Sequence, residues 1–151
     1  MKTRGNFARL ATSWLGVAVS LGASLSARAD VVLAPLFQDG CVVQREMPLR
    51  IFGQADRGEA VMVSFNGAEA KTVADERGRW LVELPVQAAS KIGLTLSVRG
   101  KNAVVVRDVL VGDVWLCSGQ SNMEMLVRDS ANAEDEIAAG AMPLIRHFKV
   151  E

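Results

Sequence analysis

Residues that bind metals or form redox centres are scarce in this 151-residue sequence. It has two cysteines, Cys41 and Cys117, one histidine, His147, and neither a CxxC nor an HExxH motif. A metal site therefore has no support, and no cofactor is expected. Both cysteines lie in apolar, strand-like segments, which favours two buried free thiols, although their pairing stays open because spacing alone does not establish a disulfide.

No charge of one sign predominates. Lys and Arg total 17, Asp and Glu total 17, and no basic stripe with interleaved aromatic residues is present. This balance argues against a nucleic-acid partner. Half of the residues are hydrophobic, so the chain can bury a packed core and wholesale disorder is not expected.

The N-terminus has the pattern of an export signal. Three basic residues precede an apolar run and an A-x-A pattern, in the order Lys2, Arg4 and Arg9, then residues 10–25, then Ala27-Arg28-Ala29. This order predicts a signal peptide over residues 1–29 and export to the periplasm or the outside. The alternative is a membrane anchor, but the run is shorter than the roughly 20 apolar residues of a span. No stable membrane span is expected after cleavage.

Residues 30–108 have the signals of an all-β sandwich. Apolar residues alternate with polar ones in short runs separated by turn residues, at positions 61–65, 68–74, 80–84, 94–98 and 103–106. Asn66-Gly67 between two such runs predicts a two-residue hairpin, because both residues tolerate positive φ. Six or seven strands at this spacing predict a small sandwich, with Trp80 in its core.

The pattern changes after Asp108. Two unalternating apolar runs, a helical segment and a last apolar segment follow, at residues 109–111, 114–117, 131–139 and 144–150. Unalternating strands are typical of a parallel sheet covered on both faces, so Trp115 is expected in a core. Ser130 or Asn132 would begin the helix and Gly140 would end it. The sequence predicts a β-α-β unit, and residues 109–151 are expected to be the truncated start of an α/β domain.

Ser121 follows this apolar segment within Ser118-Gly119-Gln120-Ser121-Asn122. Small residues after a strand allow a sharp turn that presents a hydroxyl outward, as in a nucleophile elbow, and the serine N–H can then donate to an oxyanion. The alternative is a plain polar turn, which uses the same residue types. Asp113 and Glu124 flank the turn and either orient groups there or face solvent.

A longer block resembles a known family. Residues 111–124, VGDVWLCSGQSNME, are similar to the nucleophile block of the sialate O-acetylesterase family, within the SGNH-type hydrolases. Other segments are similar to its opening strand, first helix and second strand: Phe37-Gln38-Asp39, Val42-Val43-Gln44-Arg45 and Met47-Pro48; Glu134 to Ala138; Pro143, Ile145, Arg146 and Phe148. The resemblance extends over nearly all of the chain after residue 29.

The resemblance implies a serine esterase that removes O-acetyl groups from sialic acid or other acetylated glycans through an acetyl-serine intermediate. Ser121 would be the nucleophile and a backbone oxyanion donor, with Gln120 and Asn122 beside the substrate. The family takes its base from an Asp-x-x-His block that these residues lack, and His147 is not at that position. The chain alone is therefore expected to be inactive.

A second reading comes from another class of protein. Residues 30–108 could be a glycan-binding or accessory module without catalysis, and a non-catalytic remnant is a third reading. The preferred acetylated sugar and the oligomeric state stay open.

Overall fold

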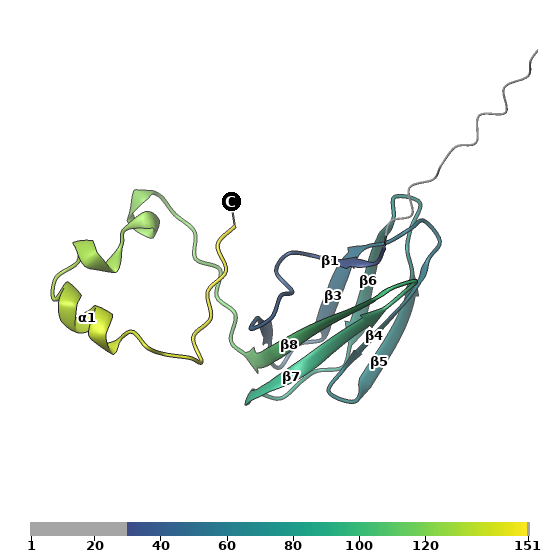
Figure 1. Ribbon diagram of the computed structural model, residues 1–151, viewed down its shortest axis with the longest axis horizontal. Coiled ribbons are helices and arrows are strands. Elements are labelled where there is room, and N and C mark those ends of the chain that lie inside the picture. Colours follow the sequence, from purple (N-terminus) through teal and green to yellow (C-terminus); the bar gives the residue numbers. More distant parts are fainter. Residues whose placement is uncertain (1–29, 151) are drawn as a thin grey trace, which may run out of the picture.

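The structure is a computed structural model that describes residues 30–150. In this part of the chain eight strands form two facing sheets, and residues 113–150 form a separate loop with little regular structure (Figure 1). The predicted signal peptide lies outside the described residues. Within residues 30–150, no helix is both long enough and apolar enough to cross a membrane.

The two sheets have different sizes and orders. The smaller sheet has the order β1-β3-β6 and consists of β1 (Val32–Leu33), β3 (Leu49–Gln54) and β6 (Arg79–Leu84). The larger has the order β2-β8-β7-β4-β5 and consists of β2 (Val42–Gln44), β4 (Ala60–Phe65), β5 (Ala68–Val73), β7 (Ser90–Arg99) and β8 (Ala103–Gly112). Only the β2–β8 pair among these strands is parallel.

One core lies between the sheets. Strand β6 buries alternate residues, Trp80, Val82 and Leu84, against partners such as Ile51 and Phe65. Each such side chain contributes about 1.5–3 kcal/mol by leaving water. We call residues 31–112 the two-sheet module. Its predicted all-β character and the predicted burial of Trp80 are confirmed.

The predicted hairpin also forms. Asn66 and Gly67 have φ of 48° and 77°, and Phe65 pairs with Ala68 across them. Positive φ at both residues is the geometry of a type I′ turn, whose twist matches that of the flanking strands. A second turn, at residues 75–78, is closed by Asp75, whose carboxylate accepts from the backbone N–H of Arg77 at 2.8 Å and that of Arg79 at 2.9 Å.

Residues 113–150 differ from the prediction. The structure has no strand at 114–117 or 144–150, so the predicted β-α-β unit is not formed. Strand β8 continues to Gly112 through its pairing with β2 and β7, but residues 114–117 pair with no strand in the described part of the chain. Trp115 and Leu116 are 83% and 91% exposed, so the predicted burial of Trp115 is wrong. An apolar run needs a covering surface before it can be buried.

The predicted helix is present as α1 (Ala133–Ala139) and ends at Gly140. Asn132 precedes it, but no side-chain hydrogen bond caps the helix. Two short 3-10 helices come before it, η1 (Ser121–Glu124) and η2 (Val127–Asp129). The boundary predicted between residues 108 and 109 stays a prediction, although β8 crosses it and buries Val109 and Val111 in the module core.

Candidate active site

Ser121 begins η1 on an exposed turn. The turn is closed by the backbone N–H of Met123, which donates to the Gln120 carbonyl at 2.9 Å. A Cβ at Gly119 would lie 2.9 Å from Met123 Cγ, so the small residue permits this tight approach. Within residues 30–150 the Ser121 hydroxyl has no hydrogen-bond partner and is open to an incoming molecule.

The other predicted site residues lie on the same turn. Gln120 and Asn122 flank Ser121 in sequence, and both are exposed. No hydrogen bond in the described part of the chain joins their side chains to Ser121. The chain itself brings these three residues together, without a supporting network of side chains.

A base for Ser121 is not assembled within residues 30–150. His147 is exposed, lies outside any helix or strand and makes no hydrogen bond to Ser121. The strand predicted at residues 144–150 does not form, so it does not hold His147. Without a base the serine hydroxyl is a weak nucleophile. No group of three or more His, Cys, Asp or Glu residues in this range is arranged to hold a metal ion.

The cysteines are both free, as predicted, but they differ in exposure. Cys41 is partly buried and Cys117 is exposed, so the predicted burial of Cys117 is wrong. Burial raises the pKa of the Cys41 thiol. Cys117 lies four residues before Ser121 in the exposed segment that the missing strand would have occupied.

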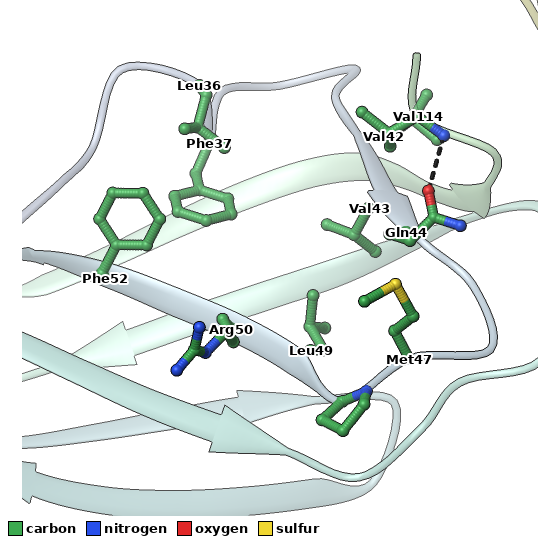
Figure 2. Close-up of a pocket in the computed structure, with 11 residues that line it drawn as sticks. Leu36, Phe37, Val42, Val43, Gln44, Met47, Leu49, Arg50, Phe52 and Val114 are labelled. Atoms are coloured by element: carbon green, nitrogen blue, oxygen red, sulfur yellow. Dashed lines mark hydrogen bonds between the residues drawn. The ribbon is translucent and has the colours of Figure 1, made fainter. Parts of the chain in front are cut away.

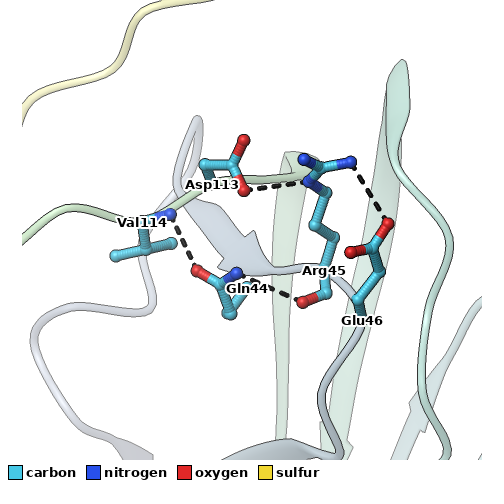
Figure 3. A network of polar contacts seen from close by, with 5 residues as sticks. All are labelled: Gln44, Arg45, Glu46, Asp113 and Val114. Atoms are coloured by element: carbon cyan, nitrogen blue, oxygen red, sulfur yellow. Dashed lines mark hydrogen bonds and ion pairs between the residues drawn. The ribbon is translucent and has the colours of Figure 1, made fainter.

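A polar network holds the chain where it leaves the module (Figure 3). The Gln44 side-chain carbonyl accepts from the backbone N–H of Val114 at 2.8 Å. Arg45 donates from Nε to Asp113 Oδ1 at 2.9 Å and also contacts Glu46. The Arg45 hydrogen bond holds the pKa of Asp113 below its usual range and raises the pKa of Arg45.

No sequence pattern points to a role for Gln44 and Arg45. Both stand in the block that resembles the family's opening strand, but their partners are 70 and 68 residues away in the chain. Only the pairing of β2 with β8 brings these residues together. The position of Asp113 beside the turn is visible in the sequence, whereas its pairing with Arg45 is not.

An apolar groove lies beside this network (Figure 2). Its volume is about 260 Å³. Its walls come from the segments before and after β2, from β2 and β3, and from Val114, and include Leu36, Phe37, Met47 and Phe52. The Phe37 and Phe52 rings meet edge to face, with centroids 5.4 Å apart. The groove is therefore lined both by the module and by Val114, the second residue of the segment 113–150.

Known proteins resemble the chain in both sequence and structure. It is 54% identical over 46 residues to the sialate O-acetylesterase of Mus musculus, and 50% identical over 52 residues to that of Homo sapiens. A crystal structure of a carbohydrate acetylesterase from Xanthomonas citri matches 74% of the chain, with 40% identity and a TM-score of 0.70. The chain is similar to sialate O-acetylesterases. The resemblance predicted from residues 111–124 is thereby confirmed.

These similarities cover only part of each relative. The matched stretch is 8% of the length of both the mouse and the human sialate O-acetylesterase, and the chain covers 26% of the Xanthomonas citri enzyme. No protein-family profile matches the chain. Most of the length of these relatives therefore has no counterpart in the described residues.

Proposed function

We propose that the chain is the nucleophile-bearing part of a serine esterase that removes O-acetyl groups from sialic acid or other acetylated glycans. The main support is the match to a carbohydrate acetylesterase of known structure, which covers 74% of the chain at 40% sequence identity. The exposed Ser121 turn supports it, because the hydroxyl is accessible and has no competing partner within residues 30–150. Export by the predicted signal peptide belongs to the same proposal.

The reaction requires one more group than these residues supply. Ser121 Oγ attacks the acetyl carbonyl carbon, its proton passes to a base, and the sugar oxygen leaves with a proton. Water then cleaves the acetyl-serine to acetate. The backbone N–H of Ser121 would donate to the oxyanion, and Gln120 and Asn122 would line the substrate. In this proposal the base comes from a region corresponding to the unmatched length of the relatives.

The exposed apolar residues around Ser121 fit the same proposal. Trp115, Leu116, Met123, Met125 and Leu126 are between 49% and 91% exposed. Exposed apolar patches of this kind mark surfaces that another surface covers. We propose that the rest of an esterase domain covers them and completes an α/β fold around Ser121.

A chimeric enzyme tests the proposal. The part of the Xanthomonas citri enzyme that the chain matches is replaced by this chain, and hydrolysis of p-nitrophenyl acetate and acetylated sialic acid is measured. Ser121→Ala is expected to lower kcat by a factor of about 10⁴ or more, as loss of a catalytic nucleophile does. Ser118→Ala, on the same exposed segment, is the matched control and is expected to retain activity.

Two results would overturn the proposal. One is an active chimera in which Ser121→Ala retains turnover. The other is esterase activity of residues 30–151 alone that persists in Ser121→Ala, because it would place the chemistry at another residue. Glycan binding by the two-sheet module, without any Ser121-dependent hydrolysis in the chimera, would favour the accessory-module reading.

A further inference from the structure

The segment that carries Ser121 leaves the two-sheet module through a specific set of contacts. Strand β2 pairs in parallel with the end of β8, and the backbone N–H of Arg45 donates to the Gly112 carbonyl at 2.9 Å. The side chains of Gln44 and Arg45 then engage Val114 and Asp113, at 2.8 and 2.9 Å (Figure 3). Backbone and side chains of β2 and the residue after it thus set the direction of the chain at residues 112–114.

The same segment returns to the same end of the module. Arg146 Nη1 donates to the Gly40 carbonyl and to Asp108 Oδ2, both at 2.9 Å. The Arg146 side chain is only 25% exposed, which is low for a segment in which nearly all other residues are exposed. A Cβ at Gly40 would lie 2.9 Å from Arg146 Nη1, so glycine leaves the space that the guanidinium fills.

The two contacts share one platform on the module. Their module residues lie within residues 40–45 and in β8, and the backbone N–H and carbonyl of Arg107 are held by Asp39 and Gly40. Between Val114 and Arg146, no hydrogen bond in the described part of the chain joins the segment to the module. Figure 1 shows residues 113–150 as a wide loop that leaves the module at the end of β8.

We propose that these contacts are two latches that orient the Ser121 segment on the module, with Arg45 and Arg146 as positioning residues. The proposal rests on the proposed function only in taking Ser121 as the group that is oriented. Exposed ion pairs are individually weak, so the latches act on geometry rather than on the stability of the module. The module is then the scaffold of the site rather than a detachable glycan-binding unit.

The exposed Cys117 permits a direct measurement. The purified chain carries Cys41→Ser, a spin label on Cys117 and a second label at Lys71→Cys, an exposed position on β5. Pulsed electron paramagnetic resonance reports the distance distribution between the labels. One narrow distance is expected, and Arg45→Ala combined with Arg146→Ala is expected to abolish it in favour of a broad distribution.

Matched variants separate positioning from folding. Arg57→Ala removes an exposed ion pair with Glu76 far from the latches and should leave the narrow distance unchanged. The charge swap of Arg45→Asp with Asp113→Arg should restore the distance that either single change broadens. Asp113→Ala serves if Arg45→Ala impairs folding, because it removes the acceptor of the Arg45 Nε–H from an exposed position.

The spin-label measurement tests the latches independently of catalysis. A distribution that stays narrow without both arginines would overturn the latches, even if the chimera hydrolyses acetyl esters. A distribution that broadens, with rescue by the charge swap, supports them even if Ser121→Ala leaves the chimera active. In an active chimera, the latch variants are expected to lower kcat with KM unchanged.

Discussion

Glu59 provides a quantitative test of the module because it is a buried carboxylate that joins two loops. It is 6% exposed. One carboxylate oxygen accepts from the backbone N–H of Lys101 at 2.6 Å, and the other accepts from that of Asp56 at 3.0 Å. Asp56 lies in the loop before β4, and Lys101 in the turn between β7 and β8. Replacing Glu59 therefore releases two backbone donors at once.

The size of the effect follows from those two donors. An unsatisfied buried donor costs about 1–3 kcal/mol, and the lower part of that range applies because both sites are only partly buried. We expect Glu59→Ala to lower the free energy of unfolding by about 2–3 kcal/mol. Glu59→Gln keeps one acceptor oxygen and should lose about half as much.

Urea denaturation followed by the fluorescence of the buried Trp80 measures these differences. Glu69→Ala is the control, since Glu69 is exposed on β5 and its loss should change stability by less than about 0.5 kcal/mol. The reasoning is refuted if Glu59→Ala is as stable as Glu69→Ala, or if Glu59→Gln is less stable than Glu59→Ala.

Two further predictions concern the segment around Ser121. In the native chain, a maleimide should modify the exposed Cys117 at least about tenfold faster than Cys41, whose thiol is partly buried and has a raised pKa. Mass spectrometry of timed samples measures both rates. Slow modification of Cys117 would instead indicate that residues 114–117 form the buried strand predicted from the sequence. The pKa of Asp113 is lowered in the folded chain, so its contact with Arg45 should be fully present at any pH above the ordinary aspartate pKa of about 3.9. The contact should be lost only when the pH falls through the lowered pKa. The spin-label distance should therefore stay narrow from pH 8 to 5 and broaden in stronger acid, with Trp80 fluorescence confirming an intact module.

Local chemistry allowed much of the module to be predicted from sequence. Asn66-Gly67 determines its turn through backbone conformations that those two residues tolerate, and the neighbouring strands follow from a period of two. The alternation around Trp80 likewise specifies which face is buried. These signals lie within a few residues of the structure they determine.

The segment after β8 could not be predicted in the same way. The continuous apolar run at residues 114–117 indicates that both faces require cover, but it does not say whether a covering surface is present. Trp115 is exposed here because none of the described elements packs over it. The pairing of Arg45 with Asp113 was missed for a related reason, since it joins residues 68 positions apart and leaves no local pattern.

The latch residues and the exposed apolar residues contribute differently to the position of Ser121. The latches fix residues 112–114 and Arg146, but more than thirty residues between them make no hydrogen bond to the module within the described part of the chain. Fixed ends hold the residues next to them, such as Cys117, but the middle of a loop of this length keeps much of its conformational freedom. If Ser121 is the nucleophile, as we propose, the exposed Trp115, Leu116 and Met123 are expected to meet a second surface before Ser121 is held precisely enough for catalysis. Removing that surface should leave Ser121 accessible but catalytically idle, whereas removing the latches should misplace it even when the surface is present.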